Sequence, residues 1–329
     1  MKILFIGGTG NISSAVSRAA IAAGHEVILL NRRNTPSEIP GAKQIQGNIS
    51  KEEEVRAALE GQTFDVVANF IAFTPADVER DMRLFSGRCG QYIFISSASA
   101  YQKPLGHPVI TESTPLRNPY WDYSRNKIAC EERLMQAYRD EAFPVTIIRP
   151  SLTYQTVIPA AIGCWNDFTL IDRIRKGGQI IVHGDGSSLW TVTHSEDFAK
   201  GMVGLLGHQQ AIGEAFHITS DELLNWTQIY EAIAAAAGAE PNMVYIPSDF
   251  IGRIVPWQIG NLRGDKAVST IFDNSKLKRF VPGFTATIPF KTGIRRTVEW
   301  FEAEPARMKI VDGNNAMMDQ IIKAYSAVL

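Results

Sequence analysis

Tyr123 and Lys127 stand four residues apart in YWDYSRNK, residues 120–127, at the start of a predicted helix. Moving a hydride to or from an alcohol carbon requires a proton to move at the oxygen, and a tyrosine with its ordinary pKa near 10 is a weak base at neutral pH. A lysine four residues later lies on the same helix face, and its positive charge favours the deprotonated tyrosine. This pair therefore indicates acid–base chemistry at a substrate oxygen.

A serine is expected to complete this chemistry. Ser97 follows the apolar run at residues 91–96, which predicts a strand, and lies 26 residues before Tyr123. At the carboxyl end of a strand, its hydroxyl would polarise the same substrate oxygen. Ser99 lies two residues later, so its side chain would point to the same side of the extended chain. It is therefore the rival for this role and a candidate substrate contact.

The stretch FIGGTGNISSAV, residues 5–16, lies near the start of the chain. It places three glycines and a threonine between an apolar run and a run of small residues. A predicted strand, a helix at residues 12–23 and a second strand at 25–30 make this a β–α–β unit. Gly7 permits the tight turn, and Gly10 lets the backbone approach a pyrophosphate at the positive end of the helix. Ser13 replaces the usual third glycine. The alternative is a glycine turn that holds no ligand.

The end of the second strand bears on which dinucleotide is bound. It reads Asn31-Arg32-Arg33, where NAD-specific proteins carry a carboxylate for the ribose hydroxyls. Two guanidinium groups suit a 2′-phosphate. We therefore expect NADP, with NAD as the alternative cofactor and a solvated basic turn as the alternative role for the arginines.

Apolar strands alternate with helices through the first half of the chain. Strands are expected at 3–6, 25–30, 43–47, 64–71, 91–97 and 145–148. This pattern predicts an α/β fold, a Rossmann-type doubly wound parallel sheet. Residues 1–150 would be the NAD(P)-binding domain, and 151–329 mostly a smaller C-terminal substrate lobe with some segments returning to the sheet.

With GGTGNIS and YxxxK in register, the chain resembles the extended short-chain dehydrogenase/reductase family, in its NAD-dependent epimerase/dehydratase group. The resemblance continues through IIRPSLTY, HGDGSSLWTVTHSEDFA, GEAFHIT and GDKAVSTIFDNSKLKRF. It implies an oxidoreductase or epimerase acting on a sugar or nucleotide-sugar-like small molecule. It favours Ser97 over Ser99, because Ser97 stands four residues before Tyr101. It also implies a homodimer through helices 75–87 and 124–140, for which the candidate residues are Val78, Met82, Phe85, Ile128 and Met135.

The resemblance also implies the cofactor contacts. They are Gly7, Gly10, Asn11, Ile12, Asn31, Arg32, Asn48, Ile49, Phe70, Ile71, Ala72, Lys127 and Pro150. Asn48-Ile49 replaces the family's usual aspartate–hydrophobe pair, which weakens the expected adenine contact.

The match is thinner in the substrate half. Trp190 stands where such enzymes carry a phosphate-binding arginine, Leu152 where many have an asparagine, and Arg263 is compatible with a second arginine. We therefore expect Trp190 and Arg263 to contact substrate, with packing in the core as the alternative role for Trp190. His194 and His217 are expected to be structural rather than substrate contacts. Three carboxylates are open candidates for the cleft wall: Asp77, Glu112 and Asp122.

Composition excludes several other classes. The formal net charge of −1 gives no support for nucleic-acid or anionic-membrane binding, and no apolar run approaches the roughly 18 residues of a membrane span. The three cysteines, Cys89, Cys130 and Cys164, form no metal-binding pattern, so we expect no metal and a cytoplasmic protein. The rival hypothesis is a non-catalytic NADP-binding or RNA-binding protein on the same fold.

Overall fold

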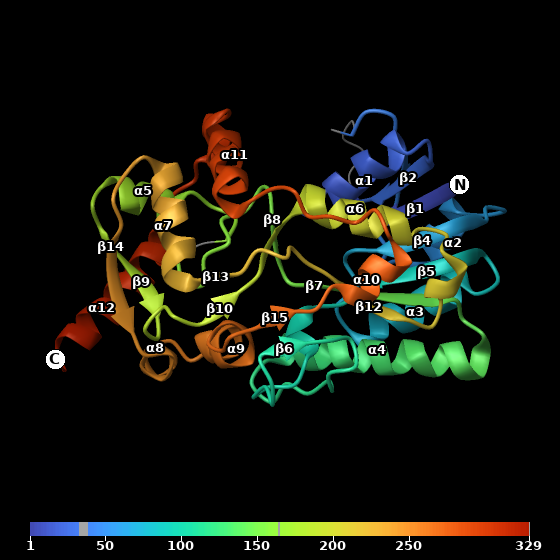
Figure 1. Ribbon diagram of the computed structural model, residues 1–329. Coiled ribbons are helices and arrows are strands. Elements are labelled where there is room, and N and C mark those ends of the chain that lie inside the picture. Colours follow the sequence, from blue (N-terminus) through green and yellow to red (C-terminus); the bar gives the residue numbers. More distant parts are fainter. Residues whose placement is uncertain (33–38, 164, 329) are drawn as a thin grey trace.

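A seven-stranded parallel sheet organises one of the two lobes of the molecule (Figure 1). The computed structural model describes residues 1–32, 39–163 and 165–328. The strand order is β12-β7-β5-β4-β1-β2-β3. The bounds are β1 (Lys2–Ile6), β2 (Glu26–Asn31), β3 (Lys43–Gln46), β4 (Phe64–Asn69), β5 (Cys89–Ile95), β7 (Val145–Pro150) and β12 (Ala215–Ile218). The predicted Rossmann-type doubly wound sheet is confirmed. β12, from the segment GEAFHIT, had not been predicted as a strand.

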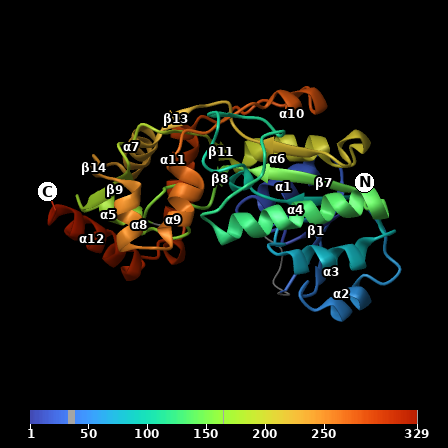
Figure 2. The same ribbon diagram turned by 90° about the horizontal axis from the view of Figure 1, so that it is seen from below.

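Helices cover both faces of this sheet. α1 (Ser13–Ala22) and α6 (Ser195–Leu205) lie on one side, and α2 (Glu52–Ala58), α3 (Pro75–Phe85) and α4 (Asp122–Glu141) lie on the other (Figures 1 and 2). Successive strand residues point to opposite faces. Ile3 and Phe5 of β1 therefore pack in the apolar cluster with α1, while Leu4 and Ile6 pack in the cluster with α3. This arrangement brings the carboxyl ends of the strands close to the N-terminus of α1.

The residues nominated for a dimer contact on α3 are wrong. Val78, Met82 and Phe85 are at most 5% exposed and belong to the apolar cluster under the sheet. Their spacing reflects the sheet-facing side of α3. On its other side, Glu79 pairs with Arg133 of α4. The homodimer itself stays a prediction, without an apolar stripe on α3 to support it.

The second lobe is built from the C-terminal half of the chain (Figure 1). Its parallel pair β9 (Gln179–His183) and β14 (Asn242–Ile246) is surrounded by helices. They are α5 (Thr169–Arg175), α7 (Trp226–Ala237), α8 (Ser248–Ile254), α9 (Gln258–Asn261), α11 (Phe290–Glu302) and α12 (Asp312–Ser326). A π-helix, Leu262–Lys266, follows α9 directly.

Three short strand pairs join the lobes. They are β8 (Leu152–Tyr154) with β11 (Val192–His194), β10 (Leu189–Trp190) with β13 (Leu224–Asn225), and β6 (Val109–Ile110) with β15 (Ile271–Phe272). α10 (Ser275–Phe280) lies with α6 and β12 beside the large sheet. The division near residue 150 stays a prediction. Among the described residues, no helix is both long enough and apolar enough to cross a bilayer.

Candidate active site

A pocket of about 400 Å³ lies at the carboxyl ends of β1, β4, β5 and β7, between the two lobes. Crevices at this edge of an open parallel sheet are the usual ligand sites of such folds. It brings together most of the residues expected from the sequence: Gly7, Gly10, Asn11, Ile12, Phe70, Ile71, Ser97, Ser99, Tyr123, Pro150 and Trp190. Residues separated by more than 180 positions in the chain thus share one cavity.

The glycine turn is shaped for close approach. Gly7 has φ +76°, which side chains rarely adopt, and a Cβ on Gly10 would meet only the Ser13 hydroxyl, at 3.4 Å. The Ser13 hydroxyl donates to the Gly7 carbonyl (2.6 Å) and accepts from the Gly10 N–H (2.8 Å). The serine that replaces the third glycine therefore stabilises the turn through two hydrogen bonds. The open face of Gly10 at the N-terminus of α1 fits a dinucleotide pyrophosphate.

Asn11 ties this turn to the second lobe. Its amide donates to the carbonyl of Thr153 (2.9 Å), and its side-chain oxygen accepts from the N–H groups of Gln155 (2.8 Å) and Thr156 (3.0 Å). The side chain is thus engaged within the protein, although the residue lines the pocket. A contact between Asn11 and a cofactor would therefore involve its backbone rather than its side chain.

Tyr123 and the two serines form one hydrogen-bonded group. Ser97 and Ser99 share a bond of 2.8 Å between their hydroxyls, and the buried Ser124 hydroxyl donates to that of Ser99 (2.7 Å). Burial raises the pKa of Tyr123 to about 12, against a hydrogen bond with Ser97 that lowers it, and the charge of Asp265 raises it further. Tyr123 is therefore protonated near neutral pH and can donate a proton.

Backbone carbonyls hold the ammonium group of Lys127. Its ammonium donates to the carbonyls of Ala72 (2.6 Å) and Ile95 (2.7 Å), and lies 5.8 Å from the centre of the Tyr123 ring. Burial lowers the pKa of Lys127 to about 8. The group is still charged at neutral pH, but the two carbonyls hold it at the ends of β4 and β5, and the burial of Tyr123 outweighs its influence.

Several expected residues lie outside the lining of this pocket. Asn31 ends β2, and Arg32 beside it is exposed; Arg33 falls outside the described residues. Asn48 accepts from the N–H of Ser50 (3.2 Å), and Ile49 is buried under the sheet.

Arg263 is the clearest difference on the substrate side. Its Nε donates to Asp249 at 2.5 Å, and it lines a separate hollow with Arg253 and Ile259. Arg263 therefore does not line this pocket, whereas Asp265 and Lys266 of the same π-helix do, and its substrate contact stays a prediction without support from the geometry.

The two histidines and two of the three candidate carboxylates do not line this pocket. His194 accepts from the N–H of Glu196 (3.3 Å) at the start of α6, and His217 Nε2 lies 2.8 Å from the Asp273 carbonyl; both histidines are buried. Asp77 caps α3, and Asp122 pairs with Arg125 on the surface.

The pocket residues that were missed include Trp121, Trp165, Asp265 and Lys266. Trp121 precedes Tyr123 by two residues, and Asp265 and Lys266 lie in the segment GDKAVS. Motifs already assigned to the site therefore lie next to these three residues in the sequence. Nothing in the sequence around Trp165 points to the site.

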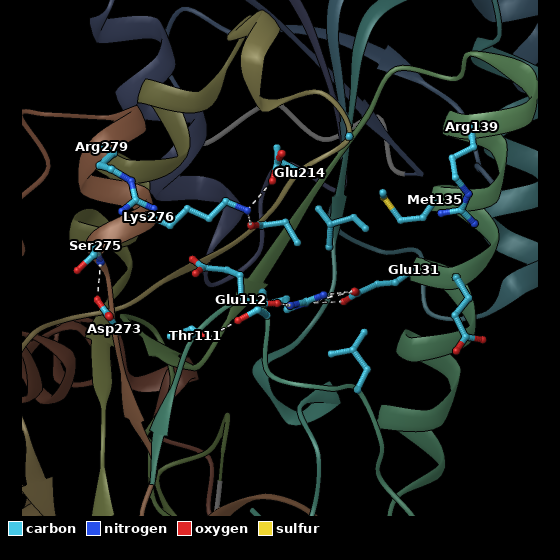
Figure 3. A pocket seen from close by; sticks show the side chains of 17 residues that line it. Thr111, Glu112, Glu131, Met135, Arg139, Glu214, Asp273, Ser275, Lys276 and Arg279 are labelled. Carbon is cyan, nitrogen blue, oxygen red and sulfur yellow. Dashed lines mark hydrogen bonds and ion pairs between the residues drawn. The ribbon is translucent and has the colours of Figure 1, made fainter. Parts of the chain in front are cut away.

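A larger hollow of about 750 Å³ opens beside α4 and α10 (Figure 3). Arg149 and Glu131 line this hollow and form an ion pair of 2.6 Å, and Glu112, another of the carboxylates considered from the sequence, also lines it. None of Ser97, Tyr123 and the glycine turn lines it. Size therefore does not identify the reaction site, and we place the chemistry in the smaller pocket.

Residues 3–219 match the NAD dependent epimerase/dehydratase family. The chain belongs to this family. The resemblance seen in the motifs is confirmed, and with it the expectation of a nicotinamide-dependent enzyme.

Two curated relatives illustrate the range of the family. One is 2'-dehydrokanamycin reductase of Streptomyces kanamyceticus, 24% identical over 86% of this chain and 80% of that protein. Another is the chloroplast stem-loop binding protein of 41 kDa b of Arabidopsis thaliana, 28% identical over 76% of this chain and 67% of that protein.

The fold is shared with solved structures. The dTDP-glucose 4,6-dehydratase of Bacillus anthracis, in complex with NAD, has a TM-score of 0.72 at 18% identity, over 93% of this chain and 98% of that chain. The UDP-glucuronic acid 4-epimerase of Bacillus cereus, also with NAD, has a TM-score of 0.71 at 18% identity, over 93% and 100%.

Proposed function

We propose that the chain transfers a hydride at a hydroxyl or ketone carbon of a sugar-like substrate, with Tyr123 as the acid or base. The observation that carries this proposal is the group formed by Tyr123, Ser97 and Ser99 on the wall of the same pocket as the open glycine turn. Epimerisation and net oxidation or reduction use the same first step. The stretch SSASAY lacks the acidic pair that a sugar dehydratase needs after its serine.

Each residue has a defined part in the reduction of a ketone. A nicotinamide would supply the hydride to the carbonyl carbon. The Tyr123 phenol donates its proton to the carbonyl oxygen as that oxygen gains charge, and Ser97 donates a hydrogen bond to the same oxygen. Oxidation reverses these transfers. Lys127 contributes its charge from the ends of β4 and β5.

The cofactor proposed is NADP(H). Gly7, Gly10 and the N-terminus of α1 would hold the pyrophosphate, and Arg32 at the end of β2 would contact the 2′-phosphate. The absence of a carboxylate at Asn31 supports this choice. The NAD complexes of the similar structures support a nicotinamide dinucleotide without deciding between the two forms. The free thiols of Cys89 and Cys130 suit a reducing compartment such as the cytoplasm.

The substrate class follows from relatives of different specificity. One is the 2'-dehydrokanamycin reductase, and another is the UDP-glucose 4-epimerase of Lactobacillus helveticus, 24% identical over 84% of this chain and 90% of that protein. A sugar-like ring is what these names share, and we extend only this to the present chain.

The test is Tyr123→Phe, which keeps the ring packing and removes the hydroxyl. We expect turnover to fall by at least about 100-fold with the cofactor Kd nearly unchanged, because only proton transfer is lost. Tyr120→Phe is the matched control, since Tyr120 does not line the pocket. Turnover is followed by NADPH absorbance. Equal rates for Tyr123→Phe and the wild type would refute the assignment.

The stem-loop binding relative supports a second candidate, RNA binding without catalysis. The near-zero net charge argues against it, as do the retained tyrosine, lysine and serine. A protein that shifts a stem-loop RNA at physiological salt and turns over no substrate would favour this candidate.

A further inference from the structure

The substrate end of the pocket has an unusual composition. Beyond Tyr123, it is lined by Trp121, Trp165 and Trp190, of which Trp190 is only 1% exposed and belongs to the apolar core. Asp265 and Lys266 supply the only charged side chains among the described residues that line the pocket. Their side chains are 14% and 8% exposed and form an ion pair of 3.0 Å. The net charge of this wall is therefore zero.

The π-helix that carries this pair is held from several sides. The Asn118 amide donates to the carbonyls of Gly264 (2.7 Å) and Ser99 (2.8 Å), which joins the π-helix to the catalytic serine segment. The Lys266 carbonyl accepts from Trp226 Nε1 (3.1 Å) and lies 3.0 Å from His183 Nε2. Short π-helical segments occur frequently at functional sites. Asp265 and Lys266 are thus presented on a preorganised support.

Trp121 fixes the same segment by packing. A Cβ on Gly260 would come within 2.5 Å of the Trp121 ring, and one on Gly264 within 3.1 Å of its Cβ. Both glycines therefore permit the close approach of an indole that also lines the pocket. The aromatic wall and the ion pair form one unit.

This unit is poorly suited to a diphosphate. Diphosphates are bound by unneutralised cations, arginine above all, through charge-assisted bonds. No arginine lines the described part of the pocket, and Arg263 is paired with Asp249 elsewhere. Lys266 is neutralised by Asp265 and donates to Asn261 at 2.8 Å. The positive end of α1 is at the glycine turn, where the cofactor would lie.

We propose, resting on the function proposed above, that the substrate is an uncharged polyhydroxylated ring without a nucleotide diphosphate, and that Asp265 and Lys266 determine this specificity. A hydroxyl both donates and accepts, so a carboxylate and an ammonium held side by side match neighbouring ring hydroxyls. The indoles of Trp121 and Trp165 would pack on the apolar C–H face of such a ring. A site that hydrogen-bonds hydroxyls discriminates strongly against analogues that lack them.

The experiment uses the full chain loaded with whichever of NADP⁺ and NAD⁺ binds more tightly. Oxidation is screened with free aldoses, methyl glycosides and cyclitols, and in parallel with UDP- and dTDP-sugars. UDP binding is titrated by calorimetry. We expect turnover of at least one free ring compound and a Kd for UDP above about 1 mM.

Asp265→Asn tests the residue itself. We expect kcat/KM for the ring compound to fall roughly 10- to 150-fold, mainly through KM, as one charge-assisted hydrogen bond is weakened. The cofactor KM should not change, and UDP should bind more tightly because Lys266 loses its counter-charge. Asp249→Asn is the matched control, since it removes an equivalent carboxylate beside Arg263, outside the pocket.

The outcomes separate the two proposals. Turnover of nucleotide sugars alone, with UDP binding in the micromolar range, would overturn the substrate class and leave the hydride-transfer function standing. Equal effects of Asp265→Asn and Asp249→Asn would overturn the role of Asp265. A wild-type protein that oxidises neither class of compound would refute the proposed function, and this inference with it.

Discussion

Lys127 offers a test of the buried site that needs no substrate. Lys127 is only 1% exposed, and this burial lowers the pKa of its ammonium group from 10.5 to about 8. Between these values the unfolded chain holds a proton that the folded protein has released. Unfolding then takes up a proton, so the free energy of unfolding rises with pH across this window. Below pH 8 both states are protonated, and the full penalty of the buried charge applies.

The size of the effect follows from the same two values. The interval between 10.5 and about 8 corresponds to roughly 3 kcal/mol. Lys127→Met keeps the length of the side chain and removes its titration. Wild-type stability, measured by urea unfolding, is therefore expected to gain roughly 3 kcal/mol relative to Lys127→Met between pH 8 and 10.5.

Subtracting the two curves removes the other groups that titrate in this range. Lys176→Met serves as the control, because the Lys176 side chain is 73% exposed and pairs with Asp172 on the surface. Its curve should run parallel to that of the wild type. If the Lys127→Met curve is also parallel, the carbonyls of Ala72 and Ile95 compensate the burial fully, and the reasoning from desolvation is wrong.

Three further substitutions probe separate parts of the site. Arg32→Ala should weaken NADP(H) binding by roughly 10- to 150-fold and leave NAD(H) almost unchanged in parallel titrations, the loss expected for one charge-assisted contact; equal effects would contradict the NADP proposal. Ser13→Ala should lower the unfolding free energy by about 1–3 kcal/mol, since two hydrogen bonds in the glycine turn are lost, and cofactor affinity should fall with it. Glu131→Gln should destabilise by about 3–5 kcal/mol by leaving the buried Arg149 charge unpaired, whereas Glu52→Gln, at a surface pair, should lose under about 1 kcal/mol in the same denaturation assay.

The cofactor end of the pocket was predictable because secondary structure alone positions it. Gly7, Phe70 and Ser97 each follow an apolar strand and Pro150 ends one, and parallel strands end at a common edge. Once the alternation of strands and helices is recognised, these residues must converge. This prediction needs only the spacing of apolar residues along each segment, which can be read from the local sequence.

Errors arose where a pattern has two physical explanations. The spacing of Val78, Met82 and Phe85 is the same for a stripe facing the sheet and for one facing a partner, and packing against the strands decided it. The ammonium group of Lys127 was expected to act on Tyr123, but its position depends on which hydrogen-bond acceptors lie nearest to it. Those are backbone carbonyls, which sequence patterns do not reveal.

The substrate end shows why specificity is harder to read than fold. Trp121, Trp165, Trp190 and Asp265 come from four separate segments, joined by short strand pairs and a π-helix with weak local signals. Arg263 pairs with Asp249, whereas Asp265, two residues later in the same π-helix, lines the pocket. A π-turn adds a residue to the helical repeat and rotates the side chains that follow. A substitution that returned this segment to regular α-helix would therefore alter which charged groups meet the substrate, while leaving the hydride-transfer residues in place.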